Sequence, residues 1–131
     1  MLSLLHIENI AVISQADITF DKGFNVLTGE TGAGKSIVID SIGAIMGERT
    51  SRDLIRTGAK SARVSALFRD LPKLAWFEEQ GIGPDENGEL LIERAIQGDG
   101  KNSCRVNGRP LLVTQLRELG QQLVNVHGQH D

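Results

Sequence analysis

The chain has 131 residues and a mass of 14.2 kDa, which is enough for one small domain. Apolar residues make up 40% and charged residues 24%, a balance typical of a globular protein that excludes a disordered tail, a collagen-like repeat and a coiled coil. Fourteen Lys and Arg against seventeen Asp and Glu give a net charge of −3. This balance argues against a domain that coats nucleic acid with a basic surface, but it leaves room for a local basic patch.

The cysteine usage and hydropathy of the chain predict a cytoplasmic protein. Its single cysteine, Cys104, excludes an internal disulfide, fits a reducing compartment and is expected to pack as a small apolar residue. No apolar run approaches the ~20 residues that a membrane helix needs, so no membrane contact is expected. Residues 1–6 carry neither a basic leader nor a small-residue cleavage site, so we do not expect a signal peptide.

Strand patterns and one helical pattern fill the first third of the chain. We expect strands at 2–8, 11–20 and 24–27 and a helix at 35–46. In the second strand, one face carries Val12, Ser14, Ala16, Ile18 and Phe20. Gly47 is expected to end the helix, and Gly43 to let it lie close to the sheet. The apolar stripe of this helix comprises Val38, Ile39, Ile42, Ile45 and Met46.

The remaining sequence predicts strands and hairpins followed by an amphipathic helix. We expect strands at 62–70, 89–97, 103–106 and 123–126, a short helix at 73–80, and a second long helix with Thr114 as its N-cap. Asn107-Gly108 is the strongest turn signal in the chain. The second long helix presents one apolar face made of Leu112, Leu116, Leu119 and Leu123. Without a repeat, linker or low-complexity tract, the chain is predicted to form one unit.

Residues 29–36 match the phosphate-loop pattern G-x-x-x-x-G-K-[ST] and lie between a predicted strand and a predicted helix. Unpaired backbone N–H groups at a helix N-terminus bind phosphate oxygens, and glycines allow close approach. Lys35 adds an ammonium group for the β- and γ-phosphates, and Ser36 supplies a hydroxyl ligand for Mg²⁺. The predicted nucleotide-binding residues are Gly29, Glu30, Thr31, Gly32, Ala33, Gly34, Lys35, Ser36 and Ile37.

The loop predicts binding of nucleotide phosphates without specifying the class of protein. The 28 residues before it leave room for two strands, whereas many small P-loop kinases begin with the phosphate-loop strand itself. Beyond the first helix come strands and hairpins instead of alternating βα units. This layout is typical of an ATP-binding-cassette head, in which an antiparallel sheet flanks the nucleotide.

Five segments together resemble the RecN family of bacterial SMC-like DNA repair ATPases, and the resemblance extends over essentially the whole chain. The phosphate loop alone is generic, but its combination with the Asn-Gly hairpin and the terminal His-Gly-Gln-His is much more discriminating. The segments are residues 5–10 (LHIENI), 23–36 (GFNVLTGETGAGKS), 45–49 (IMGER), 105–109 (RVNGR) and 127–130 (HGQH).

The resemblance implies an α/β fold of the P-loop NTPase type, with residues 1–131 as the N-terminal lobe of an ATPase head that has a mixed sheet and an antiparallel β subdomain. In this family the two ends of a long chain, joined by a coiled coil, assemble the head. Residues 1–131 contain neither a Walker B strand ending in Asp-Glu nor a Ser-Gly-Gly signature, both of which belong to the family's C-terminal lobe. The implied partners are that C-terminal lobe, a second head in a homodimer and DNA, and the implied location is the cytoplasm, at the nucleoid.

Gln129 falls where the family's Q-loop glutamine is expected. The resemblance therefore implies that its side-chain amide is a second Mg²⁺ ligand and helps to orient the attacking water, with Lys35 as the other catalytic residue. The alternative interpretation of Gln129 is a polar residue at a frayed terminus. His127 and His130 are spaced as metal ligands can be, but with only Asp131 nearby they fit polar loop residues better than a zinc site. His6 is expected to be structural.

Residues 48–63 carry five basic against two acidic side chains, a local charge of +3 in an acidic chain. Three interpretations stay open for this stretch: a solvated charged face, a contact with DNA phosphates, or an arginine that acts on nucleotide in its own head or across a dimer. The candidates for a nucleotide or DNA contact are Arg49 and Arg52.

The leading hypothesis is the ATP-binding part of an SMC-like head that acts in DNA double-strand break repair and recombination. ATP and Mg²⁺ would bind at residues 29–36 and drive engagement of two heads, and hydrolysis would release it. The segment alone is expected not to hydrolyse ATP, because the glutamate-bearing strand is missing. The alternatives are a stand-alone P-loop kinase, which would need a substrate lid and a catalytic acid that we cannot assign, and a module that binds nucleotide without hydrolysing it.

Overall fold

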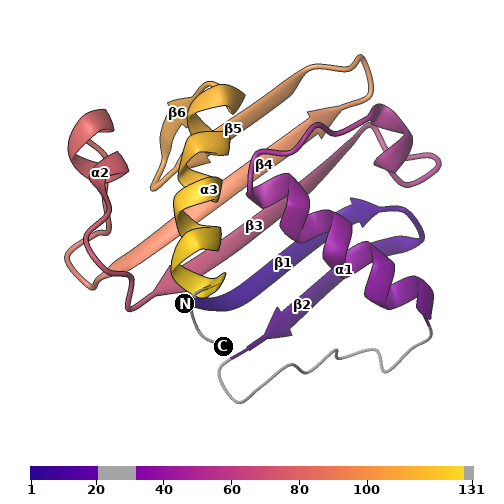
Figure 1. Ribbon diagram of the computed structural model, residues 1–131. Helices are drawn as coiled ribbons and strands as arrows, with labels where there is room; N and C mark the ends of the chain where they lie inside the picture. The colour runs from indigo at the N-terminus through magenta and orange to yellow at the C-terminus, as the bar shows by residue number, and fades with distance from the viewer. Residues whose placement is uncertain (21–31, 129–131) are drawn as a thin grey trace.

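The computed structural model describes residues 1–20 and 32–128 of the chain (Figure 1). Its elements agree with most of the predicted strands and helices, and the predicted strand at 24–27 lies outside the described residues. The elements are β1 (Leu2–Ile10), β2 (Ile13–Thr19), α1 (Gly32–Ile45), the 3₁₀ turn η1 (Arg52–Leu54), β3 (Ser61–Arg69), α2 (Ala75–Gln80), β4 (Glu89–Gln97), β5 (Asn102–Val106), β6 (Arg109–Leu111) and α3 (Val113–Gly128).

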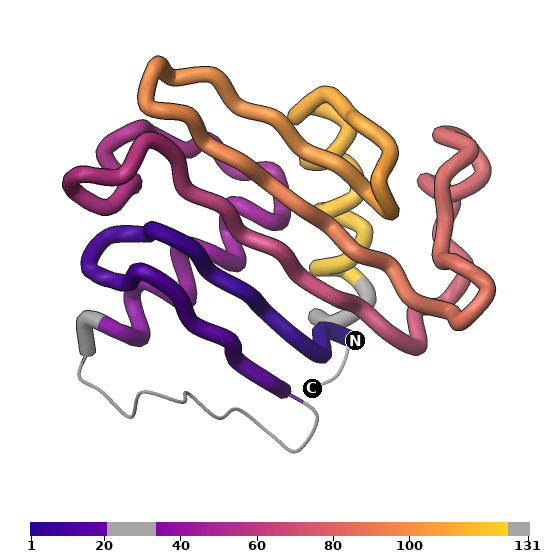
Figure 2. Tube along the Cα trace, turned by 180° about the vertical axis from the view of Figure 1, so that it is seen from behind, coloured from indigo at the N-terminus to yellow at the C-terminus, as the bar shows by residue number. Residues whose placement is uncertain are grey.

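All six described strands join one antiparallel sheet in the order β2-β1-β3-β4-β5-β6. Both long helices cover the same face of it: α1 and α3 lie in front of the strands in Figure 1, and in Figure 2, seen from behind, the strands lie in front of the helices. The short helix α2 lies beside α3, where the Trp76 indole N–H donates to the Gln115 carbonyl at 2.9 Å. The predicted antiparallel β subdomain is therefore confirmed.

Alternate side chains of the central strands build the core beneath the two helices. A strand turns successive side chains to opposite faces, so a sheet covered on one side alternates between buried and accessible residues. The accessible residues of β3 and β4, such as Arg63 and Glu93, lie on the face away from the helices. The buried residues of these two strands are Ala62, Val64, Ala66, Phe68, Leu90, Ile92, Arg94 and Ile96.

Helix α1 buries a stripe that only partly matches the predicted one. Val38 and Ile45 are buried as expected. Ile39 is 64% exposed, so the prediction that it widens the buried stripe is wrong. The stripe widens on the other side of the helix instead, through Ile37 and Ser41, since residues four apart share a face. The Ser41 hydroxyl is satisfied within the helix, because it donates to the Ile37 carbonyl at 2.8 Å.

Gly43 in α1 makes room for a side chain and not for the sheet. A Cβ at this position would lie 2.6 Å from Oε1 of Glu48, and the Gly43 carbonyl accepts a hydrogen bond from the Glu48 N–H at 3.0 Å. The expectation that Gly43 lets the helix approach the sheet is therefore wrong. This glycine instead allows the chain to fold back against α1 just after the helix ends.

Helix α3 begins earlier and ends later than predicted. Thr114 is not its N-cap: the helix begins at Val113, and the Gln115 side chain reaches back to the Leu112 N–H at 2.8 Å, as in half of a capping box. Leu112 therefore precedes the helix and is 68% exposed, whereas the other three leucines of the predicted stripe are fully buried.

The predicted strand at 123–126 is wrong, because α3 continues through it to Gly128. Leu123 lies four residues after Leu119 and seven after Leu116, on the same helix face, and is buried with them. This spacing favours a continued helix over a new strand. At 16 residues α3 is the longest described helix, and no helix in residues 1–20 and 32–128 is long and apolar enough to cross a membrane.

The end of α1 and the middle of α3 meet in backbone contact. A Cβ at Gly120 would lie 2.2 Å from the carbonyl oxygen of Met46, and a Cβ at Gly47 would lie 2.5 Å from the backbone nitrogen of Arg117. Gly47 also has a φ of +88°, which glycine adopts without strain. Two glycines thus set the spacing of the two helices.

His6 has a structural role, as expected, on the edge hairpin formed by β1 and β2. Its Nδ1 lies 2.5 Å from Asp17 Oδ1 and its Nε2 lies 3.1 Å from Glu8 Oε2. The hydrogen bond to Asp17, reinforced by Glu8, raises the pKa of His6 above its usual value, although partial burial acts in the opposite direction. The contact between His6 and Asp17 therefore joins the two strands, and the carboxylates favour the protonated form of the imidazole.

Replacing Gly120 with alanine is expected to lower the free energy of unfolding by about 1–3 kcal/mol, because the methyl group overlaps the Met46 carbonyl. The helix propensity of alanine offsets at most ~1 kcal/mol of this loss. The measurement is the urea midpoint of Gly120→Ala beside the control Gly83→Ala, whose Cβ would meet its nearest neighbour, Phe77, at 3.5 Å. A Gly120→Ala midpoint at or above that of the wild type would contradict the close contact.

The stability of the chain is expected to fall as pH rises through the raised pKa of His6. A histidine whose pKa is higher in the folded than in the unfolded state stabilises the fold fully below the unfolded value of 6.5 and loses that contribution above the folded value. Because Asp17 is largely exposed, we expect no more than about 1 kcal/mol. Urea unfolding of the wild type and of His6→Asn between pH 5 and pH 9 measures it. Parallel pH profiles would rule out the contribution.

Candidate functional site

The first turn of α1 carries the second half of the phosphate-loop motif. Gly29, Glu30 and Thr31 lie outside the described residues, and residues 32–36 form the start of the helix. The first four N–H groups of a helix have no partner within it, and the helix dipole places partial positive charge at this end. No acidic residue lies in this first turn. The backbone therefore presents a site suited to an anion.

Lys35 and Ser36 are both exposed on this first turn, and neither side chain hydrogen-bonds to another described residue. Both are thus available to a ligand. Ile37, which follows them, is only 7% exposed and packs into the core. If Ile37 takes part in binding, as predicted, only its backbone can do so, and its side chain fixes the helix to the sheet.

The opposite end of α1 is held by a buried arginine that the sequence analysis did not single out. Arg94 on β4 is 2% exposed, and its Nη1 donates to the Ala44 carbonyl at 2.9 Å and to the Glu48 carbonyl. Its Nη2 lies 3.4 Å from Oγ1 of Thr50. Burial lowers the pKa of Arg94, yet the guanidinium stays charged because its usual pKa is so high. A cation at the C-terminal carbonyls of a helix also complements the helix dipole.

A signal for Arg94 was present in the sequence. It shares a strand face with Leu90 and Ile92, so the alternating pattern of β4 already places a charged side chain among core residues. A charged residue on an apolar face needs partners. Those partners are Ala44 in the last turn of α1 and Glu48 and Thr50 in the segment that follows the helix, 44 to 50 residues away from Arg94 in the chain. The identity of those partners follows only from the fold.

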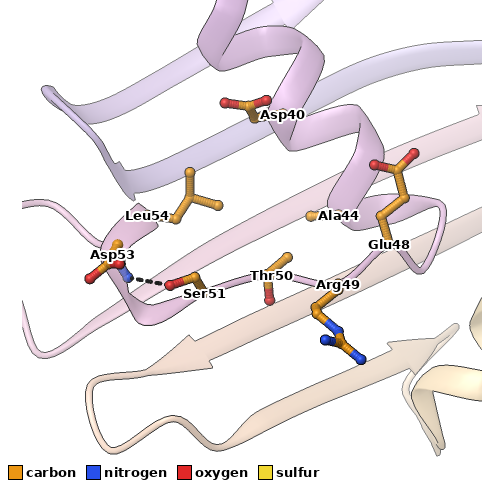
Figure 3. A pocket seen from close by; sticks show the side chains of 8 residues that line it. All are labelled: Asp40, Ala44, Glu48, Arg49, Thr50, Ser51, Asp53 and Leu54. Atoms are coloured by element: carbon orange, nitrogen blue, oxygen red, sulfur yellow. Dashed lines mark hydrogen bonds between the residues drawn. The ribbon is translucent and has the colours of Figure 1, made fainter.

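A cavity of about 320 Å³ lies between α1 and the segment that follows it (Figure 3). Arg49 lines this cavity, and Arg52 does not, although both side chains are exposed. Three of the lining residues are acidic, so the cavity repels phosphate groups except where Arg49 offsets those charges. The lining residues are Asp40, Ala44, Glu48, Arg49, Thr50, Ser51, Asp53 and Leu54.

The five basic residues of the segment 48–63 are all exposed, and no described acidic group forms an ion pair with any of them. This arrangement is compatible with each of the three interpretations of the stretch. Cys104, by contrast, is buried as expected, with its Sγ 3.3 Å from the Leu111 carbonyl. Burial raises the pKa of its thiol, which disfavours the thiolate form.

The candidate residues at the end of the chain cannot be placed in the site. Gln129, His130 and Asp131 lie outside the described residues, and the backbone of His127 is helical. The expectation that a strand leads into Gln129 is wrong, because α3 occupies that part of the chain. Within residues 1–20 and 32–128, no group of three His, Cys, Asp or Glu side chains could hold a metal ion.

Curated proteins similar to this chain are named RecN. The chain is 46% identical over 134 residues to the DNA repair protein RecN of Halalkalibacterium halodurans and 44% identical over 135 residues to that of Bacillus subtilis. Each alignment covers 100% of this chain but only 24% and 23% of the relative. The chain therefore spans about a quarter of the length of these relatives, and the predicted resemblance to RecN is confirmed.

The fold also resembles solved heads of SMC ATPases. A structure of an SMC ATPase, described for ATP-driven dimerization and DNA-stimulated activation, superposes with a TM-score of 0.67 and 26% identity, covering 89% of this chain and 75% of that one. The predicted fold class, a head of the SMC type, is confirmed by this likeness. Residues 4–118 match the AAA domain family. With most of its length in that match, the chain belongs to the AAA domain family.

Proposed function

We propose that the chain is the ATP-binding lobe of an SMC-like ATPase head that acts in DNA double-strand break repair and recombination. The observation that carries the proposal is the exposed pair Lys35 and Ser36 on the first turn of α1, directly after the glycines of the phosphate loop. The relatives support the biological setting, because they are DNA repair proteins. That setting favours a cytoplasmic location at the nucleoid.

The residues of the loop suit a nucleotide triphosphate with its magnesium ion. Backbone N–H groups at the start of α1 bind the phosphate oxygens, and Lys35 neutralises the β- and γ-phosphates. The Ser36 hydroxyl and the Gln129 amide are oxygen ligands of the kind that Mg²⁺ prefers, and they would hold it. Bound there, the ion supplies positive charge to the phosphate oxygens.

The remaining parts of the reaction would come from elsewhere. In this proposal the C-terminal lobe of the full-length chain and a second head in a homodimer complete the site, and ATP then favours engaged heads over separate ones. The dimerization and DNA activation described for the SMC ATPase of similar fold support this arrangement. DNA would bind to the assembled protein.

Of the two candidate arginines, Arg49 has the better position for a nucleotide contact. It lines the cavity beside α1, the helix whose first turn carries Lys35. Arg52 lies on η1, outside that lining, and is more suitable for an exposed contact with DNA phosphates. Both roles are parts of the proposal.

Titration of the chain with Mg-ATP tests nucleotide binding directly. We expect Lys35→Ala to weaken binding by about tenfold to a hundredfold, the loss typical of a hydrogen bond from a charged group. Isothermal calorimetry measures the affinity, and Lys73→Ala, another exposed lysine far from α1 in the sequence, is the matched control. The proposal is wrong if the wild type gives no magnesium-dependent heat, or if both variants bind equally well.

The isolated 131-residue chain is expected to show no appreciable ATP turnover, because it contains no Walker B glutamate to activate water. Release of inorganic phosphate measures this, with the Lys35→Ala chain as background. Turnover that disappears in Lys35→Ala would show that these residues hold a complete site. Transfer of phosphate to a small-molecule acceptor would favour the kinase alternative, and turnover restored by adding the C-terminal part of the protein would exclude a module that only binds nucleotide.

A further inference from the structure

Arg94 is a buried cation without a carboxylate partner in the described part of the chain. Its side chain is almost completely covered, its Nε has no hydrogen-bond partner, and all its contacts are with uncharged oxygens. Burying a charge in this way is unfavourable compared with an apolar residue of similar size. A residue that served only to fill the core would therefore not need a guanidinium.

The oxygens that Arg94 binds belong to one short stretch of chain. They are the carbonyls of Ala44 and Glu48 and the hydroxyl of Thr50. The same hydroxyl donates to Oδ1 of Asn102 on β5 at 3.0 Å. Glu48 and Thr50 are the two neighbours of Arg49, so the chain is held to the sheet on both sides of Arg49, through the Glu48 carbonyl on one side and the Thr50 hydroxyl on the other. The Arg49 side chain itself stays exposed and lines the cavity.

We propose that Arg94 is a positioning residue, which fixes Arg49 relative to the helix that carries Lys35 and Ser36. Arg94 joins the last turn of α1 to the segment after it, and thereby sets the distance between the first turn of α1 and the Arg49 side chain. The expected effect on Mg-ATP affinity rests on the proposed function, in which Arg49 contacts the nucleotide. The positioning of Arg49 by Arg94 does not depend on that function, because it follows from the contacts of Arg94 alone.

Arg117 offers a matched comparison at the same end of α1. Its Nε donates to the Gly47 carbonyl at 3.3 Å, but its side chain is exposed and binds neither neighbour of Arg49. If any arginine at the end of α1 could hold the segment around Arg49, replacing Arg117 would have the same effect as replacing Arg94. The contacts instead assign the fixing of Arg49 to Arg94.

A double-mutant cycle on the chain tests the inference, with Mg-ATP affinity measured for Arg94→Met, Arg49→Met and the variant carrying both. Each single change is expected to weaken binding by about tenfold, and the double variant by no more than either, because a misplaced Arg49 has no contact left to lose. Arg117→Met is expected to bind within about twofold of the wild type. Losses that multiply in the double variant, or an Arg94→Met affinity equal to that of the wild type, would overturn the proposal.

Hydrogen exchange separates this proposal from the proposed function. Amides of residues 48–50 are expected to exchange at least about tenfold faster in Arg94→Met than in Arg117→Met, while those of β1 and β3 keep their rates. If Arg94→Met does not fold, Arg94→Lys takes its place in both measurements and should restore part of the protection. Equal exchange in the two arginine variants contradicts the positioning role. If the wild type does not bind Mg-ATP but residues 48–50 still exchange faster in Arg94→Met than in Arg117→Met, only the proposed function is contradicted.

Discussion

The one-sided packing of α1 against the antiparallel sheet is the constraint on which the candidate site depends. Ile37 and Val38 pack the helix into the core, while Lys35 and Ser36 just before them are exposed. The first N–H groups of a helix have no partner within it. At the other end Arg94 binds the Ala44 carbonyl in the last turn and the Glu48 carbonyl just after the helix. A helix held through its buried face and at its C-terminus keeps Lys35 and Ser36 in a defined position, and prepositioned groups bind a ligand at a lower ordering cost.

The sequence predicted those parts of the fold that depend on local periodicity. Alternation in β3 and β4, the buried leucines of α3 and the Asn107-Gly108 turn each follow from neighbours within one element, and the structure has all three. The turn residues both have positive φ, at 48° and 81°, as a tight hairpin requires. The phosphate-loop motif could likewise be recognised in the sequence, because its chemistry needs a fixed local spacing of glycines, lysine and serine.

Contacts between elements that lie far apart in the sequence could not be predicted in the same way. Gly120 resembles a weak point within a helical pattern, and only the approach of the Met46 carbonyl shows why a side chain is excluded there. Gly43 was assigned to the wrong neighbour for the same reason, since Glu48 folds back onto it after the helix ends. Arg94 stood on an apolar face, but its partners lie on another element. Tertiary contacts decide such positions, and a single sequence does not contain them.

The distribution of charge along α1 bears on how a nucleotide would bind in the proposed site. The first turn carries Lys35 and no acidic residue, whereas the cavity farther along the helix is lined by Asp40, Glu48 and Asp53. Phosphate groups are attracted to the first and repelled by the second. Arg49 is the one basic side chain among the residues that line the cavity, so it is the group there that can offset the carboxylates. In the proposal, the placement of Arg49 by Arg94 sets how strongly the acidic residues of the cavity oppose the triphosphate, so the two arginines are expected to behave as a coupled pair.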